Sequence, residues 1–189
     1  MIARHETIEQ RRLELQVTLD AAKSQVARNK LGQFATPTNL AMDILCLAKS
    51  VLPEGCPVRF LDPAFGSGAF YSALLQCFSE GRIVWAKGYE IDPHYGRPAR
   101  ELWESTPLAL ALSDFTMEAT PVAEMDKATL VVCNPPYVRH HHLNLKTKQR
   151  LRAASLEAAG VDMTGLTGLY CYFMAWCQIT PFRKCMEQV

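Results

Sequence analysis

The sequence predicts an α/β fold with a mostly parallel sheet, and three observations support this. Four short apolar segments, among them 58–61 and 128–133, have the continuous hydrophobic pattern of strands buried on both faces. Apolar residues recur at helical spacing before the first strand, over 39–52, and after it, over 69–78. Glycine or polar residues follow each strand, and open α/β sheets bind ligands at these carboxyl ends.

The tetrapeptide Asn134-Pro135-Pro136-Tyr137 follows the last of these strands and is the most informative feature of the chain. Its prolines fix φ, remove backbone donors and restrict the residues before them. The Asn134 side-chain oxygen and the backbone carbonyls remain as acceptors beside the Tyr137 ring. This combination suits an amino group held by its two hydrogens while a flat base stacks on the ring. A plain turn at a strand end is the alternative.

A glycine-containing turn joins the first strand to the helix over 69–78. It lies in the segment Leu61-Asp62-Pro63-Ala64-Phe65-Gly66-Ser67-Gly68-Ala69-Phe70. Gly66 and Gly68 permit a positive φ and a close approach of a ligand to the backbone. The third glycine of the dinucleotide fingerprint is missing, which argues against a dinucleotide oxidoreductase.

Acidic residues end the second and third strands. Glu90 ends the segment Lys87-Gly88-Tyr89-Glu90-Ile91-Asp92, where a carboxylate can accept hydrogen bonds from both ribose hydroxyls. Asp114 and Phe115 follow the strand 108–112, where they can hold the amino group and the face of an adenine. The alternatives are a solvated strand end for Glu90 and an Asx-type turn for Asp114.

Together these segments resemble the amino-terminal part of an S-adenosylmethionine-dependent DNA adenine (N6) methyltransferase of restriction-modification type. The matching segments are Gly32-Gln33-Phe34-Ala35-Thr36-Pro37, Leu61 to Phe70, Gly88 to Pro93, Ser113-Asp114-Phe115 and Leu130 to Val138, with a weaker match over 168–177. The resemblance implies a Rossmann-like methyltransferase fold with three α/β/α layers. The Phe-Ala-Thr-Pro segment precedes the glycine turn, as in the subgroup whose target-recognition region follows the catalytic domain.

The resemblance also implies a role for each matching residue. The cofactor S-adenosyl-L-methionine is expected to contact Thr36 and Pro37 at its methionine part, Asp62, Ala64, Gly66 and Gly68 at its amino-acid end, Glu90 at its ribose, and Ile91, Asp114 and Phe115 at its adenine. The catalytic residues are expected to be Asn134, Pro135, Pro136 and Tyr137: Asn134 and the Pro135 carbonyl accept hydrogen bonds from the target amine, and Tyr137 stacks on the target base.

The expected chemistry needs neither a strong base nor a metal. An aromatic amine is a poor nucleophile because its lone pair is delocalised into the ring. Two acceptors on its hydrogens localise that lone pair, so that the nitrogen can attack the sulfonium methyl in line. A stacked base cannot reach such a pocket, so the target adenine of double-stranded DNA must be flipped out of the duplex.

The composition predicts a cytoplasmic globular domain without a membrane segment. The chain has 189 residues, enough for one core, and no run approaches the ~18 apolar residues of a membrane helix. The first six residues are too polar for a signal peptide. The seven cysteines lack metal-type Cys-x-x-Cys pairs, which favours buried thiols in a reducing compartment over a disulfide framework.

A basic patch follows Tyr137, although the net charge of the chain is only +1. It comprises Arg139, His140, His141, His142, Lys146, Lys148, Arg150 and Arg152. Of these, Arg139, Lys146 and Lys148 are the expected contacts with the DNA backbone; a solvated helix face is the alternative. Consecutive histidine side chains diverge, so no metal site is expected.

We divide the chain into an amino-terminal amphipathic helix within residues 1–31 and an incomplete methyltransferase domain over 32–189. The helix is expected over 6–31, with a heptad-like stripe that Arg12 interrupts and a stop at Asn29-Lys30-Leu31-Gly32. Packing on the domain is the first interpretation of this helix, and association with a partner is the second.

We expect the carboxyl-terminal strands of the sheet and a target-recognition domain to be missing from this sequence. Residues 170–177 form an expected helix that is apolar nearly all round, which in the family is buried by the later strands. Left uncovered, it would expose an apolar patch. Because only four strands can be placed, we expect a truncated chain that needs a complementing carboxyl-terminal chain or a specificity subunit. By itself it is expected to bind the cofactor weakly and not to methylate specific DNA.

Three functions remain open from the sequence. The first is the DNA adenine methyltransferase. The second is a methyltransferase acting on a protein glutamine or an RNA base, because Asn-Pro-Pro-Tyr also suits those targets. The third is a non-catalytic cofactor-binding remnant or subunit.

Overall fold

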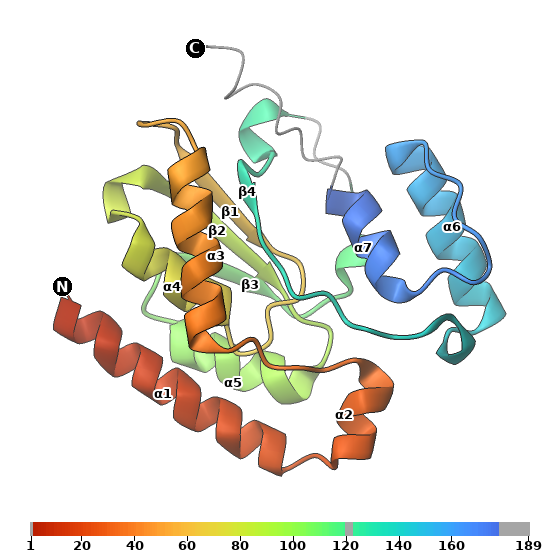
Figure 1. Cartoon of the computed structure of the whole chain (residues 1–189), viewed down its shortest axis with the longest axis horizontal. Helices are drawn as coiled ribbons and strands as arrows, with labels where there is room; N and C mark the ends of the chain where they lie inside the picture. The colour runs from red at the N-terminus through yellow and green to blue at the C-terminus, as the bar shows by residue number, and fades with distance from the viewer. Residues whose placement is uncertain (1, 120–122, 178–189) are drawn as a thin grey trace.

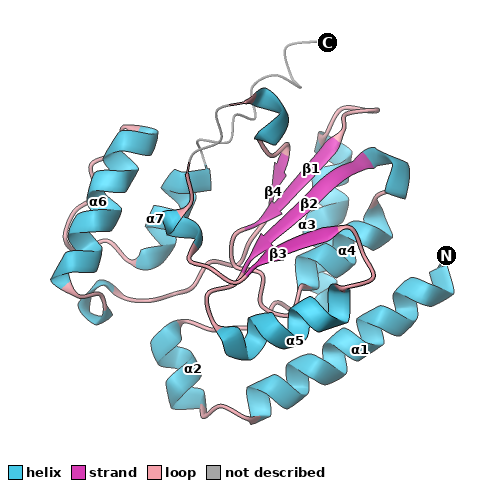
Figure 2. Ribbon diagram, turned by 180° about the vertical axis from the view of Figure 1, so that it is seen from behind, coloured by secondary structure: helices cyan, strands magenta, loops and turns pink. Residues whose placement is uncertain are grey.

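A four-stranded parallel sheet forms the centre of the computed structural model, which describes residues 2–119 and 123–177. Its strands are β1 (Val58–Asp62), β2 (Ile83–Tyr89), β3 (Leu108–Ala111) and β4 (Leu130–Val131). Figure 2 shows the four strands side by side with helices around them. All pairings are parallel, which confirms the predicted α/β class.

The strand order is β3-β2-β1-β4, so the direction of winding reverses beside β1. Phe60 of β1 lies between Ala86 of β2 and Leu130 of β4. The chain adds β2 and β3 on one side of β1 and then returns to add β4 on the other. The loops after β1 and β4 therefore diverge at a topological switch point, where open α/β sheets bind ligands. This order places the glycine turn beside Asn-Pro-Pro-Tyr.

Helices cover the sheet in two groups (Figures 1 and 2). The first group comprises α3 (Thr38–Val51), α4 (Ala69–Cys77) and α5 (Pro93–Trp103), with α3 packed on α4. The second is the pair α6 (Leu145–Ala159) and α7 (Leu169–Cys177) on the opposite side of the molecule. Short 3₁₀ helices span Glu80–Arg82, Phe115–Met117, Glu124–Asp126 and His140–His142. The predicted helices over 39–52, 69–78 and 170–177 are confirmed within one residue at each end.

The main core lies between the sheet and the first group of helices. Phe60, Tyr71, Leu74 and Trp103 are almost completely buried there. The Tyr71 and Trp103 rings meet edge-on with their centroids 5.0 Å apart, a favourable geometry for an aromatic pair. This packing fixes α4 and α5 behind the turns that follow β1 and β2.

The single helix predicted over 6–31 is wrong, because the chain forms two helices, α1 (Ile2–Ala21) and α2 (Gln25–Leu31). Ser24 lies between them in an extended conformation, and its hydroxyl accepts a hydrogen bond from the Ala27 N–H at the start of α2. Such a serine begins a new helix. The predicted stop is confirmed, since Gly32 ends α2 with a φ of 64°.

The heptad-like stripe describes α1 only in part. Leu19 is buried, but Val26 on α2 is 78% exposed. Arg12 was expected to interrupt the stripe. Its side chain is only 1% exposed, so it belongs to the buried face of α1. The helix α1 contacts α4 and α5, so it packs on the domain as the first interpretation held.

Helix α7 is buried on only one face within the described part of the chain. Tyr172, Phe173 and Ala175 are buried, whereas Tyr170 and Met174 are 41% and 58% exposed. Within residues 2–119 and 123–177, α7 therefore leaves part of its apolar surface uncovered, as expected where no later strands pack on it. The tail 178–189, on which the expectation of missing strands depends, lies outside the described residues. In the described part, no helix is long and apolar enough to cross a membrane.

Candidate active site

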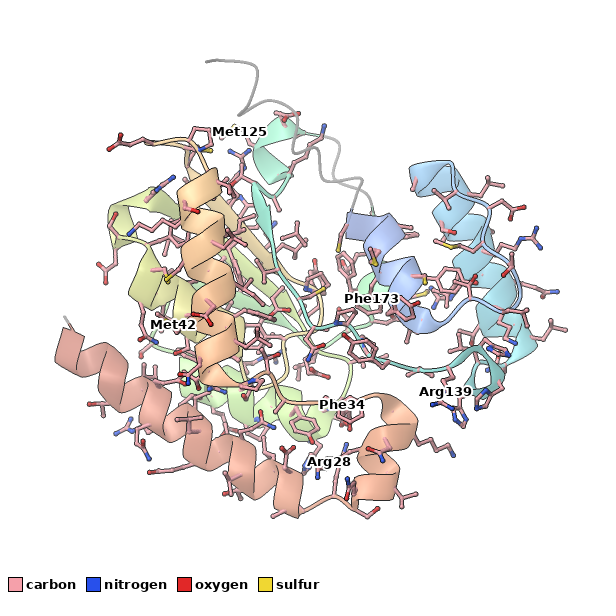
Figure 3. All side chains as sticks on the ribbon, in the orientation of Figure 1. Arg28, Phe34, Met42, Met125, Arg139 and Phe173 are labelled. Carbon is pink, nitrogen blue, oxygen red and sulfur yellow. The ribbon has the colours of Figure 1, made fainter. Side chains whose placement is uncertain are left out.

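A cleft of about 390 Å³ lies at the carboxyl ends of the strands and gathers residues from all four strand ends. Eight of the predicted site residues line it: Ala64, Gly66, Glu90, Ile91, Asp114, Phe115, Asn134 and Pro136. Phe34 and Phe173 line it from opposite sides, one from the segment after α2 and the other from α7 (Figure 3). Four motifs chosen from separate parts of the sequence thus form one site.

The two glycines of the turn after β1 serve different purposes. Both have a positive φ, 57° at Gly66 and 91° at Gly68. A Cβ at Gly68 would lie 2.6 Å from Trp103 Nε1 and 2.7 Å from the Phe65 ring, whereas nothing lies within 4 Å at Gly66. Gly68 therefore lets the turn pack on the core, and Gly66 leaves the backbone open at the cleft. Gly68 does not line the cleft itself.

Glu90 joins the turn after β1 to the turn after β2. Its Oε2 accepts a hydrogen bond from the Gly66 N–H and its Oε1 accepts one from the Asp92 N–H, each at 2.8 Å. Burial raises the pKa of Glu90, and these two backbone hydrogen bonds oppose that rise. A carboxylate oxygen can accept more than one hydrogen bond, so Glu90 can still receive a hydroxyl from the cleft.

Asp62 lies behind the cleft instead of lining it. Its side chain is fully buried, Oδ1 accepts the Ala64 N–H at 3.1 Å, and Oδ2 has no hydrogen-bond partner among the described residues. Burial raises the pKa of Asp62 to about 8, with a further contribution from the Glu90 charge. A buried carboxyl with an unused oxygen is costly and is typical of functional sites.

At the turn after β3, the Asp114 side chain accepts hydrogen bonds from a nearby backbone N–H and from Arg150, a residue of the predicted basic patch. Its Oδ1 accepts the Thr116 N–H at 2.9 Å, which confirms the Asx-type turn. Its Oδ2 accepts from Arg150 Nη2 at 3.3 Å. Phe115 packs between Tyr89 and Phe173, with ring centroids 5.3 and 5.9 Å away.

Asn134 is held so that its amide oxygen is the group left for a ligand. Its Nδ2 donates to the Phe34 carbonyl at 3.0 Å and to Thr36 Oγ1 at 3.3 Å. No described residue donates a hydrogen bond to Oδ1. The segment Phe-Ala-Thr-Pro therefore fixes the orientation of the Asn134 amide. Thr36 and Pro37, predicted to contact the cofactor directly, do not line the cleft, and Pro37 precedes the first residue of α3.

Tyr137, the last residue of Asn-Pro-Pro-Tyr, does not line the cleft and lines a second hollow of about 1020 Å³. Phe34 and Tyr170 line the same hollow, with their ring centroids 6.3 and 6.1 Å from that of Tyr137. Lys30 and Arg139 add positive charge to its walls. We call this space the aromatic hollow.

The predicted basic patch divides into two parts. Arg139 lines the aromatic hollow, and Lys146 is exposed on α6 near Lys148. Their contact with a DNA backbone stays a prediction. Arg150 instead enters the cleft, and Arg152 forms a two-pronged ion pair with Asp162 at 2.5 and 2.7 Å. Among the described residues no group of three or more His, Cys, Asp or Glu side chains is placed to hold a metal ion.

The amino-terminal segment contributes to the cleft in a way that no motif of the sequence indicated. Gln16 and Asp20 of α1 line it, together with Leu31 and Gln33 at and after the end of α2. Gln33 Nε2 donates to the Asp92 carboxylate at 2.6 Å, and Lys23 forms an ion pair with the same group. The polar positions of α1 were open to a functional interpretation, but only the fold shows which of them face the cleft.

Solved structures with the same fold identify the architecture. A Listeria monocytogenes protein assigned as a class I S-adenosylmethionine-dependent methyltransferase superposes with a TM-score of 0.65 at 18% identity, over 92% of this chain and 50% of that chain. This chain has the class I methyltransferase fold. The type IIG restriction endonuclease BpuSI is also similar, with a TM-score of 0.55 at 16% identity, over 78% of this chain and 18% of that chain.

Two curated proteins are similar in sequence, and both are type II methyltransferases. M.AccI of Acinetobacter calcoaceticus is 28% identical over 148 residues, and M.XamI of Xanthomonas campestris pv. amaranthicola is 28% identical over 149 residues. These alignments cover 78% and 76% of this chain but only 25% and 26% of the relatives, so the chain spans about a quarter of their length. No protein-family model matches the chain.

Proposed function

We propose that this chain is the cofactor-binding and catalytic part of a DNA methyltransferase. In this proposal it transfers a methyl group from S-adenosyl-L-methionine to the N6 amine of an adenine, within a cytoplasmic restriction-modification system. The observation that carries the proposal is the orientation of Asn134, whose amide nitrogen is held by the Phe34 carbonyl and Thr36, leaving the oxygen as an acceptor at the switch point. The similarity to two type II methyltransferases supports the choice of DNA.

The residues of the cleft fit the proposed cofactor. Gly66 offers an open backbone where the amino-acid end would lie, with the unused Oδ2 of Asp62 behind it. Glu90 is the proposed acceptor for the ribose hydroxyls. Asp114 and Phe115 are the proposed contacts for the adenine, and Ile91, which is 66% exposed, offers an apolar surface that a ring would cover. The volume of the cleft, about 390 Å³, is within the range of small-molecule sites.

In the proposed reaction the protein positions the amine and polarises it. When bound, the cofactor would supply an electrophilic methyl group on a sulfonium, whose carbon–sulfur bond breaks as the carbon–nitrogen bond forms, leaving the electron pair on sulfur as a neutral thioether. Asn134 Oδ1 and the Pro135 carbonyl accept the two amine hydrogens, which localises the nitrogen lone pair toward the methyl group. The positive charge that develops on the nitrogen is stabilised by the same two oxygens, and one proton then leaves to water. Pro135 and Pro136 carry no N–H, so no donor competes with the amine at this point.

The aromatic hollow is the proposed entry for the target base. Phe34 and Tyr137 are 54% and 53% exposed, and Tyr170 is 41% exposed. Exposed rings of this kind stack on bases that have left a duplex. Arg139, Lys146 and Lys148 are the proposed contacts with the flanking phosphates of double-stranded DNA.

The test is made where the chain has any partners that it needs. We would replace Asn134 by Ala at the chromosomal locus and map modified bases in the genomic DNA. The proposal expects one class of N6-methyladenine sites to disappear. Unchanged DNA methylation, or the loss of a methylated RNA base or protein glutamine instead, would overturn the DNA assignment. A deletion of the gene is the matched control, since it must remove the same sites.

A further inference from the structure

A buried polar cluster joins α1 to the two segments that shape one end of the cleft. Its centre is Arg12, which is 1% exposed, and its partner Glu9 is 9% exposed. Neither residue belongs to the motifs that predicted the site, and the proposed reaction uses neither. A buried ion pair far from solvent needs a reason, because apolar side chains would hold a helix to a core equally well or better.

The guanidinium of Arg12 makes four hydrogen bonds at once. Nε and Nη2 donate to the two Glu9 oxygens at 2.7 and 2.6 Å. Nη1 donates to Ser67 Oγ at 3.1 Å, and Nη2 also donates to Thr38 Oγ1 at 3.0 Å. Burial alone would raise the pKa of Glu9, but hydrogen bonds from Arg12, Ser72 and Thr38 outweigh it, so the pKa lies below its ordinary value and Glu9 is a carboxylate.

The two outward contacts of Arg12 are the informative ones. Ser67 stands between Gly66 and Gly68 in the turn after β1, and Thr38 directly follows Thr36-Pro37. The Ser67 carbonyl is held separately by Trp103 Nε1 at 2.9 Å. One planar cation thus fixes the distance between the glycine turn and the start of α3, and its rigid fork suits this task better than a lysine would.

Other contacts of the amino-terminal segment reach a different part of the cleft. Lys23 and Gln33 hold the Asp92 carboxylate, and the Tyr95 hydroxyl donates to Asp20 at 2.8 Å. These residues surround the turn after β2, on the side proposed for the ribose. Arg12 therefore acts on the glycine turn, and Lys23 acts on the turn after β2.

We propose that Arg12 is a positioning residue for the amino-acid end of the cofactor. It sets the glycine turn against the start of α3 through Ser67 and Thr38. The inference rests on the proposed cofactor, and it makes α1 a part of the binding site in addition to a packing element.

The test compares two ligands that share the adenosine part and differ in the sulfonium and the amino-acid end attached to it. S-adenosylmethionine has the amino-acid end, and adenosine lacks it. In Ser67→Ala, which removes a single hydroxyl, and in Glu9→Gln/Arg12→Met, which replaces the ion pair without leaving a lone buried charge, calorimetry should show S-adenosylmethionine binding about tenfold weaker. Adenosine binding should stay within about twofold of wild type.

Three further variants sharpen the comparison. Lys23→Met, on the ribose side, should weaken both ligands to a similar degree. Thr38→Val should reproduce the effect of Ser67→Ala, and Thr38→Ser, which keeps the hydroxyl, should restore binding of S-adenosylmethionine. The melting temperature of every variant is measured first, and only variants that melt above the titration temperature are titrated, so that the folded state is measured.

Each outcome decides the proposal. Equal weakening of both ligands in the Arg12 and Ser67 variants would mean a general structural role and would overturn it, as would no change in either ligand. If the wild type and the variants bind S-adenosylmethionine equally well, the positioning role is overturned and the proposed cofactor stands. Folded wild-type protein that binds neither ligand would overturn the proposed cofactor and this inference together.

Discussion

The cleft and the aromatic hollow share Phe34 and are each lined by part of Asn-Pro-Pro-Tyr, but they are built differently. The turns around the cleft are held by short hydrogen bonds with buried or half-buried groups, such as those of Glu90 and Arg12. The hollow presents three rings that are each at least 41% exposed. A site whose walls are fixed in advance suits a small cofactor, and an exposed aromatic surface suits a larger ligand that completes it.

This difference predicts where substitutions should cost stability. Changes around the cleft should disturb folding, because its turns are also packed against the core. Changes in the hollow should leave folding intact and affect only a ligand. Three variants test this division, in order of expected effect.

Gly68→Ala should destabilise the protein by about 2–4 kcal/mol. A methyl group there would lie 2.6 Å from Trp103 Nε1, at a φ of 91° that alanine rarely adopts. Urea unfolding measures the loss. Gly81→Ala is the matched control, because nothing lies within 4 Å of its Cβ position and its φ is not positive. Equal stabilities of the two variants would show that the turn is not packed as described.

Asp62 should make the protein less stable as the pH rises. Because burial raises the pKa of Asp62 to about 8, the folded state keeps a proton that the unfolded state loses near pH 4. The folded state therefore loses stability from about pH 4 up to pH 8, by at most ~1.4 kcal/mol per pH unit. Glu90, whose pKa is also raised, acts in the same direction.

Asp62→Asn replaces the titrating carboxyl by an amide that does not titrate. The unfolding free energy of this variant should therefore fall less steeply between pH 5 and pH 8 than that of wild type. Urea unfolding of both proteins at several pH values measures the slopes. Glu9 and Asp92, with lowered pKa values, do not interfere, since their contributions are lost only at acidic pH. If the unfolding free energy of Asp62→Asn fell with pH as steeply as that of wild type, Asp62 would not be the source of the pH dependence.

Tyr137→Ala should leave the unfolding free energy within about 0.5 kcal/mol of wild type, because the ring is 53% exposed. It should weaken binding of single-stranded DNA, which presents unstacked bases, by about 1–3 kcal/mol. Fluorescence anisotropy at low salt measures the binding. Met125→Ala is the control: Met125 is 80% exposed and lies far from the hollow (Figure 3). A large loss of stability in Tyr137→Ala would erase the contrast between the two regions.

The sequence predicted the sheet well because its signals are local. Continuous apolar runs mark β1 to β4, and each is followed by a residue that lines the cleft, such as Gly66 or Asn134. Parallel strands bring their carboxyl ends to one edge, so a list of strand ends is already a list of neighbours. The Asx-type turn at Asp114 was also foreseeable, because it involves residues two positions apart.

The contacts that the sequence could not predict join distant segments. Arg12 bonds to Ser67 across 55 positions, and Arg150 bonds to Asp114 across 36. A charged residue in an apolar stripe looks like an interruption until its buried partners are known. The break at Ser24 was missed because a heptad-like spacing continued across it, although a serine before a helix is a common start signal.

The most direct test of the proposed cofactor site is calorimetric titration of the purified, folded chain with S-adenosylmethionine, with Asp114→Ala as the comparison. We expect saturable binding that is at least about tenfold weaker in the variant, because the adenine amino group loses its acceptor. Absence of saturable binding to the folded wild-type chain, or equal binding by the variant, would overturn the assignment of this cleft.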